Sequence, residues 1–263
     1  MIVPSDKDVV RNLLRLHVAA NLGIYFDGID ELNGDLAYCW SDSITDYYWN
    51  YGFSFQADDL DGQQVQQITR VASSHGRQPA LWQLADSDTP EGWSSVSDEA
   101  WMTLDLSAIQ AIAAPSLEVT VELLETPTPA MVATFSDAYA SDAGPGEVGY
   151  FALPPEYSNR FAVGRSRPPA SSHVVGASVG GESVAVACIC LVEDSVGLYS
   201  VATAHQWRRH GLGRYISAKS LQFARNMGAS TAFLQTESNS AVEHMYSSLG
   251  FNRRFVGRLY SQM

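Results

Sequence analysis

The residues best suited to chemistry lie in one short segment at 208–213, RRHGLG, which has the form R-x-x-G-x-G. The apolar and β-branched run Val196–Thr203 precedes it and predicts a buried strand. From Gly211 to Met227 apolar residues follow at helical spacing, and Gly228 predicts the end of that helix. A helix N-terminus offers unpaired N–H groups and a positive dipole end, and glycines let an anion approach closely. The segment therefore predicts a pyrophosphate cradle.

A glycine pattern alone is weak, as residues 174–183 (VVGASVGGES) show. These glycines fall between two apolar runs, which favours a hairpin turn over a ligand loop. The segment at 208–213 gains specificity from a second motif further along the chain. A short apolar strand at Thr231–Thr236 is succeeded by Asn239 and by a helix that ends in residues 246–251, YSSLGF.

These two motifs, in this order and spacing, resemble the GNAT superfamily of acyl-CoA-dependent N-acyltransferases. The resemblance covers about Leu117–Met263, just over half of the chain. It implies an α/β fold, a mixed sheet flanked by helices, in the C-terminal half. It also implies acetyl-CoA as co-substrate, bound by Val201, Ala202, Thr203, Arg208, Arg209, His210, Gly211, Leu212, Gly213, Arg214, Asn239 and Tyr246.

By the same resemblance, the backbone of residues 201–203 should bind the pantetheine arm, where the sheet splays. One N–H there should polarise the thioester carbonyl, and such a donor is commonly worth ~3 kcal/mol. Residues 208–213 should wrap the pyrophosphate. The chain departs from the commonest family pattern at Thr203 and His205, but neither change removes a backbone amide.

Tyr246 matches the family tyrosine that faces the leaving sulfur. A phenol with a free pKa of about 10 can protonate the departing thiolate, and packing beside Leu249 and Phe251 is the alternative. The general base is harder to assign, because the central strand carries no carboxylate. Glu237 is the first candidate for the base, because its strand borders the point where the sheet splays. The alternative is that Glu237 is a solvated turn residue without a catalytic role. For Asn239, contact with pantetheine and capping of the following helix both remain open.

The net charge of −13 is unevenly distributed. Residues 1–115 hold five basic and 17 acidic residues, whereas residues 199–263 hold eight basic and two acidic ones. The predicted cradle is thus locally basic, as an anionic co-substrate favours. The acidic half argues against a nucleic-acid partner and favours a cationic amine, although solubility alone also explains it.

Cys39, Cys188 and Cys190 lie in apolar surroundings, which predicts buried free thiols and a cytoplasmic protein. No run is long enough for a membrane span, and the first residues lack the form of a signal peptide. A membrane is therefore not expected as a partner. A metal is not expected either, because no residue cluster has metal-ligand spacing.

The N-terminal half predicts a helix at Asp8–Gly23, a strand at Tyr47–Gln56, and a helix at Gln63–Ser74 capped within the preceding acidic turn. Strands follow at Pro79–Leu84 and Trp101–Leu106. This order resembles part of a second, degenerate GNAT-like domain without the cradle motif. The predicted division is therefore 1–115 for that domain and 116–263 for the acetyltransferase domain.

The first functional hypothesis is transfer of an acetyl group from acetyl-CoA to a primary amine by direct attack. The alternative is a GNAT-fold module that senses acyl-CoA or binds a partner with weak or no catalysis. The acceptor is a small molecule or a peptide amine, which the sequence does not identify. The acyl length stays open too, as does the choice between monomer and homodimer.

Overall fold

The computed structural model describes residues 4–109, 112–141, 149 and 151–262. The chain divides into two compact units. Unit 1 combines the residues up to Thr103 with those from Phe233 onward, and unit 2 comprises Leu104–Ala232. The division at residue 115 stays a prediction. In packing terms, the chain leaves the N-terminal unit after Thr103 and returns to it at Phe233.

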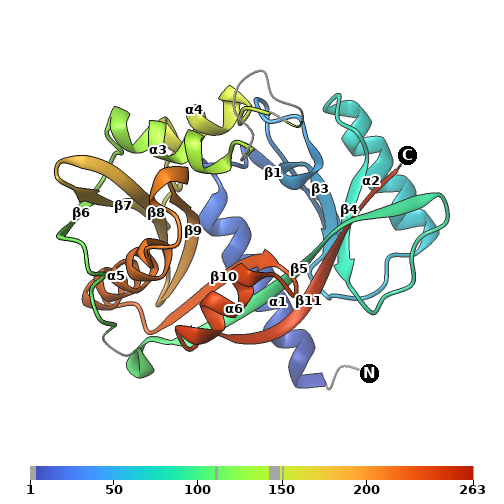
Figure 1. Ribbon diagram of the computed structural model, residues 1–263. Coiled ribbons are helices and arrows are strands. Elements are labelled where there is room, and N and C mark those ends of the chain that lie inside the picture. Colours follow the sequence, from blue (N-terminus) through green and yellow to red (C-terminus); the bar gives the residue numbers. More distant parts are fainter. Residues whose placement is uncertain (1–3, 110–111, 142–148, 150, 263) are drawn as a thin grey trace. The chain divides into compact units, whose positions relative to one another are not determined.

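Unit 2 is an antiparallel sheet in the order β9-β8-β7-β6, covered by helices (Figure 1). Its elements are β6 (Val119–Leu124), α3 (Pro129–Tyr139), α4 (Pro155–Val163), β7 (Ser171–Val179), β8 (Glu182–Val192), β9 (Ser195–Thr203), the 3-10 helix η3 (His205–Trp207) and α5 (Leu212–Asn226). The predicted hairpin at 174–183 is confirmed, with Gly180 and Gly181 at positive φ in the turn between β7 and β8. The predicted strand and helix on either side of residues 208–213 are confirmed as β9 and α5.

Helices α3 and α4 lie on one face of this sheet and α5 on the other (Figure 1). Thr128 caps α3 by accepting a hydrogen bond from the N–H of Met131, and Pro129 occupies its first turn. Met131 and Phe135 of α3 then pack against Phe161 of α4 and against the sheet. Gly176 of β7 permits this approach, because a Cβ there would collide with the Met131 side chain.

Unit 1 is a mixed sheet in the order β1-β2-β3-β4-β11-β5-β10. Its strands are β1 (Gly28–Asn33), β2 (Leu36–Trp40), β3 (Tyr51–Ser54), β4 (Ala80–Leu84), β5 (Trp93–Asp105), β10 (Thr231–Glu237) and β11 (Asn252–Gln262). Strands β3 and β4 are parallel, whereas β11 runs antiparallel to both β4 and β5. The helices are α1 (Pro4–Asn21), η1 (Tyr47–Trp49), α2 (Gly62–Ser74) and α6 (Ala241–Ser248).

Two groups of apolar and aromatic side chains pack in unit 1, one under α2 and one beside α1. Asp61 caps α2 in a reciprocal capping box with Gln64, which confirms the capped helix. Helix α2 then buries Ile68 against residues such as Tyr38 and Tyr260. A separate aromatic group includes the α1 residue His17, which packs against the rings of Phe26, Trp49 and Trp101.

The predicted strand at Tyr47–Gln56 is only partly correct. Asp46 accepts a hydrogen bond from the N–H of Tyr48 and starts η1, so the strand begins later, at Tyr51. Strands β1, β2 and β11 and helix α4 had no counterpart in the sequence-based description. Strand β5 begins at Trp93, eight residues before the start predicted for it.

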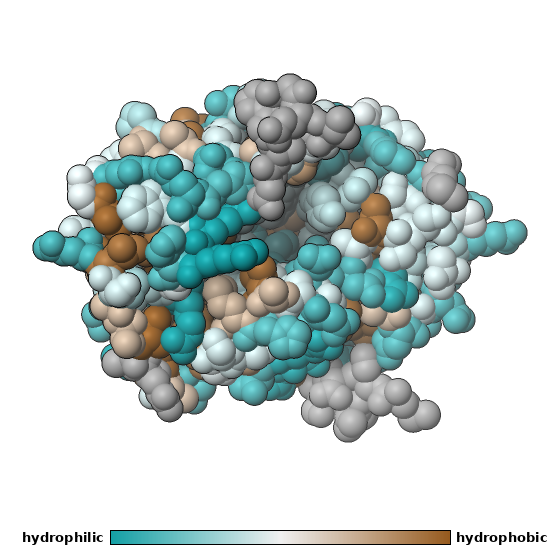
Figure 2. All heavy atoms as spheres, in the orientation of Figure 1, coloured by the Kyte–Doolittle hydropathy of each residue, from teal (hydrophilic) through white to brown (hydrophobic). Residues whose placement is uncertain are grey.

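One face of the protein is mostly polar. Figure 2 shows a largely hydrophilic face on which hydrophobic residues form small, separate patches. All three cysteines are buried free thiols, as predicted. Within the described ranges, no helix combines the length and hydropathy that a membrane crossing requires.

Candidate active site

Strand β9 is interrupted by a bulge next to its C-terminal end. Tyr199 pairs with Cys188 of β8 but Ala202 pairs with Val186, so β9 holds one extra residue between the two pairs. Ser200 lies in this bulge with φ of 52°, a left-handed conformation that is unusual for a residue other than glycine. Bulges redirect backbone groups out of the ladder and are frequent beside active sites. The geometry thus singles out the segment that was predicted to bind the pantetheine arm.

The turn after β9 is fixed by two carboxylates of unit 2. Asp137 of α3 accepts a hydrogen bond from the backbone N–H of His205 at 2.8 Å. Glu182 of β8 accepts from the side chains of Gln206 at 2.5 Å and Trp207 at 3.1 Å. The 3-10 helix η3 is therefore anchored at both ends before the chain enters residues 208–213.

Within residues 208–213, two residues adopt positive φ. Arg209 has φ of 65° and Gly211 has φ of 78°. Arg208 donates from its Nη2 to the carbonyl of Ala138 at 2.7 Å, near the C-terminus of α3. Arg208 thus ties the loop to α3, and its predicted contact with pyrophosphate stays a prediction. The Nδ1 of His210 lies 2.9 Å from the carbonyl of Arg208, which folds the ring back on the loop.

Helix α5 begins without a side-chain cap from any described residue, because its N-cap is Gly211. Its first intrahelical bond runs from the N–H of Tyr215 to the carbonyl of Gly211 at 3.0 Å. The N–H groups of Leu212 and Gly213 precede that bond and have no acceptor within the helix. A Cβ built on Gly211 meets no heavy atom within 4 Å, so the approach to this turn is open. These features suit a pyrophosphate group.

The other predicted site residues, Glu237, Asn239 and Tyr246, belong to unit 1. Ser240, not Asn239, caps α6, because its Oγ accepts from the N–H of Glu243 at 3.1 Å. The capping alternative for Asn239 is therefore wrong. Asn239 has φ of 61° and donates its N–H to Glu243 at 2.6 Å.

Tyr246 lies on α6 with only 5% of its surface exposed. Its ring meets Phe251 edge-on, with the centroids 5.7 Å apart. The packing role is thus present, and the proton-donor role stays a prediction. Glu237 is exposed at the end of β10, where its carbonyl accepts from the hydroxyl of Ser240 at 2.7 Å.

The family comparison agrees with this geometry. Residues 132–251 match the sequence model of the Acetyltransferase (GNAT) family, a segment that includes β9, the cradle loop, α5 and α6. The chain contains a GNAT acetyltransferase domain. The ribosomal protein bS18-alanine N-acetyltransferase of Escherichia coli strain K12 is 32% identical over 81 residues. That alignment covers 30% of this chain and 55% of the relative, so the chain spans about half the length of the curated relatives that it matches.

Solved structures extend the similarity of fold beyond the GNAT domain. A GCN5-related N-acetyltransferase from Kribbella flavida has a TM-score of 0.67 at 17% identity, covering 97% of this chain and 95% of that one. A tandem GNAT protein from the clavulanic acid biosynthesis pathway has a TM-score of 0.55 at 12% identity, with coverage of 86% and 77%. These similarities confirm the α/β fold with a mixed sheet. They also extend into the N-terminal half, where a second GNAT-like domain stays a prediction.

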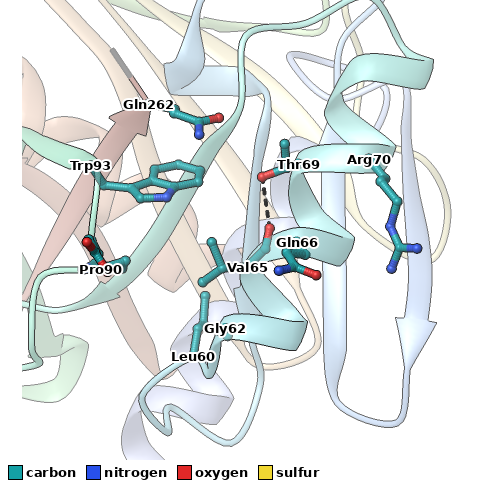
Figure 3. A pocket seen from close by; sticks show the side chains of 10 residues that line it. Leu60, Gly62, Val65, Gln66, Thr69, Arg70, Pro90, Trp93 and Gln262 are labelled. Atoms are coloured by element: carbon teal, nitrogen blue, oxygen red, sulfur yellow. Dashed lines mark hydrogen bonds between the residues drawn. The ribbon is translucent and has the colours of Figure 1, made fainter.

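Two pockets lie within unit 1, away from the loop at residues 208–213. One, of about 650 Å³, is bordered by α2 and the start of β5, with Trp93 on its wall (Figure 3). The hydroxyl of Thr69 is already bonded to the carbonyl of Val65 at 2.9 Å. Among the described residues, its charged lining consists of the exposed side chains Arg70 and Glu91. The described lining of this pocket therefore holds no buried titratable group.

The second pocket, of about 400 Å³, lies beside β5 and β10. Its lining includes Glu237, the predicted base, together with Tyr48, Glu99 and Gln235. Burial raises the pKa of Glu99 to about 7. Sequence reasoning missed Glu99. The available signal was its position two residues before a buried tryptophan on one strand, which places both on the same face.

Proposed function

We propose that this protein transfers an acetyl group from acetyl-CoA to a primary amine by direct attack of the amine on the thioester. The observation that carries this proposal is the uncapped N-terminus of α5, which follows a bulged strand and an open glycine turn. An anion such as a pyrophosphate can accept from several N–H groups of such a turn at once. The buried free thiols fit a reducing compartment such as the cytoplasm.

In this proposal different residues bind the parts of acetyl-CoA and assist the transfer. Backbone groups of Val201, Ala202 and Thr203 bind the pantetheine arm, and one N–H stabilises the charge that develops on the thioester oxygen. The N–H groups of Leu212 and Gly213 hold the pyrophosphate, assisted by the charge of Arg209. Tyr246 supplies a proton to the departing thiolate.

The relative in Escherichia coli, named as a ribosomal protein alanine N-acetyltransferase, suggests which acceptors to test first. Small amines with the structure of an N-terminal alanine form the first panel. The second candidate function is an acyl-CoA-binding module with weak catalysis, which is favoured by the lack of a carboxylate on β9. Both functions require the same cradle, and thiol release in the presence of amines separates them.

The test is a calorimetric titration of acetyl-CoA and of free coenzyme A into the wild type and Gly211→Asp. A carboxylate at about 5 Å from a phosphate charge costs about 3 kcal/mol at an effective dielectric constant of about 20. We therefore expect binding about 100-fold weaker. Gly211→Asn is the matched control, because asparagine tolerates positive φ comparably and adds no charge, so its affinity should stay within about five-fold of the wild type.

Equal losses in Gly211→Asp and Gly211→Asn would show that backbone strain, not charge, causes the effect. Absence of binding in the wild type would refute the enzyme and the acyl-CoA-binding module together.

A further inference from the structure

Glu99 occupies a distinctive position in the pocket beside β5 and β10. It lies on the same strand face as Trp101, which is 1% exposed and packs against Trp82 and Phe255. Across the ladder its partner on β11 is Gly257, which has no side chain to offer a counter-charge. Glu99 therefore lies at the boundary between an aromatic core and a pocket, with no cation opposite it on β11.

The neighbouring carboxylate shows the contrast. Asp98 is paired across the ladder with Arg258, whose Nε and Nη2 donate to its two oxygens at 2.5 and 2.7 Å. These hydrogen bonds lower the pKa of Asp98. The two successive acidic residues of β5 thus differ in environment. Asp98 is held as a carboxylate in an ion pair, whereas the surroundings of Glu99 favour its protonated form.

Other titratable groups near Glu99 do not neutralise it. Tyr48 of η1 lines the same pocket, and its pKa is raised mainly by burial, with smaller contributions from Tyr47 and Glu99. Glu237 of β10 adds a second carboxylate at the exposed end of the pocket. His17 of α1 packs on Trp101, but burial lowers its pKa to about 4, so it carries no charge near neutrality.

A chain of hydrogen bonds fixes a donor in the same pocket. The Nδ2 of Asn21 lies 3.4 Å from Nδ1 of His17, which leaves the other ring nitrogen to donate to Gln235. That hydrogen bond partly opposes the lowering of the His17 pKa by burial, as expected when the ring donates to the amide oxygen. The Nε2 of Gln235 is buried and has no hydrogen-bond acceptor among the described residues. A ligand oxygen in this pocket would satisfy it.

We infer that Glu99 is the general base that deprotonates the acceptor amine, while the amide N–H of Gln235 binds an oxygen close to that amine. This inference rests on the proposed acetyl transfer and names its acceptor class, a primary amine with a neighbouring carbonyl or hydroxyl oxygen. The pocket volume of about 400 Å³ suits a group of this size. Glu99 here replaces Glu237 as the base, and Glu237 remains at the exposed mouth.

The proton balance is closed by the chain's own groups. Glu99 removes one proton from the ammonium, and the freed nitrogen lone pair forms the C–N bond as the C–S bond breaks. The nitrogen releases a second proton to solvent on forming the amide. The thiolate receives its proton from Tyr246, which regains one from solvent, and Glu99 passes its own proton to solvent. The net reaction releases one proton per amide formed.

The experiment uses the full chain and alaninamide, which carries an amine next to a carbonyl. The carboxyl carbon of Glu99 is followed by carbon-13 NMR against pH, with Glu99→Gln to assign the signal. We expect titration near pH 7 and a signal shift when alaninamide is added. The kcat/KM for alaninamide should rise with pH through that titration, and Glu99→Gln should lower it ~100-fold and abolish the rise.

The matched variant is Glu237→Gln, which removes a carboxylate from the same pocket and should keep the rise with pH. Gln235→Met should raise the KM for alaninamide about 10-fold and leave that for sec-butylamine, which lacks the oxygen, unchanged. Calorimetry of acetyl-CoA with Glu99→Gln should equal the wild type. If acetyl-CoA binds the wild type but alaninamide does not shift the Glu99 carbon-13 signal, this inference is refuted and the proposed function is not. If acetyl-CoA does not bind, the proposed function fails.

Discussion

Replacing Arg253 by methionine removes the cation from a buried carboxylate in unit 1. The side chain of Glu243 is 6% exposed, and Arg253 donates to its two oxygens from Nε at 2.6 Å and Nη2 at 2.7 Å. The N–H of Asn239 adds a third hydrogen bond at 2.6 Å. Methionine keeps much of the length of arginine but offers no donor, so Glu243 would keep its charge with far less compensation.

The expected cost follows from the exposure of the two partners. Removing one partner of a buried ion pair typically costs about 3–5 kcal/mol. The side chain of Arg253 is 40% exposed, so solvent screens the pair and we expect about 2–3 kcal/mol. Arg258→Met is the matched control on the same strand, because its partner Asp98 is 39% exposed. That control should cost about 1 kcal/mol.

The dependence on pH provides a second readout. Hydrogen bonds from Arg253 lower the pKa of Glu243 in the folded state below its unfolded value of about 4.3. The stabilisation is therefore complete above that value and is lost as the pH falls through the folded pKa. The difference between wild type and Arg253→Met should accordingly shrink below about pH 4.

Urea unfolding followed by tryptophan fluorescence measures this cost, because five of the six tryptophans lie in unit 1. Equal losses in the two arginine variants, together with a difference that does not change with pH, would refute the reasoning.

Two further predictions concern the GNAT domain. Tyr246→Phe should lower kcat ~100-fold with little change in the affinity for acetyl-CoA, measured by steady-state kinetics and calorimetry; unchanged turnover would leave only the packing role. Ser200→Val should lower the stability by about 1–2 kcal/mol, because a β-branched residue is strained at φ of 52°, whereas Ser200→Gly should be nearly neutral. Thermal unfolding checks this pair, and a valine variant as stable as the glycine variant would contradict the strained bulge.

Local patterns were sufficient for the elements around the cradle. Strand β9, helix α5 and the hairpin between β7 and β8 follow from periodicity and glycine placement within short windows. The capped start of α2 followed from Asp61 in the same way. These elements are specified by neighbouring residues, which is why the sequence alone could predict them.

The missed elements have different causes. The hairpin of β1 and β2 turns at Gly34-Asp35, with Gly34 at positive φ, a turn signal that the sequence-based description did not use. Strand β11 carries three arginines, and its pairing with β4 and β5 depends on residues far away in the chain. The role inferred for Glu99 also depends on distant residues, because the pocket that surrounds it includes β10.

Strand β11 also constrains the order in which the chain can fold during synthesis. It lies between β4 and β5, and Gln78 bonds to the carbonyl of Gln262 across 184 residues. Unit 2 lies entirely between these segments and can fold as soon as it leaves the ribosome. At about 5–20 residues per second, the roughly 150 residues from Thr103 to Asn252 take about 8–30 s to synthesise. During that time the edges of β4 and β5 that β11 covers stay unpaired, so the sheet of unit 1 is completed only at the end of synthesis.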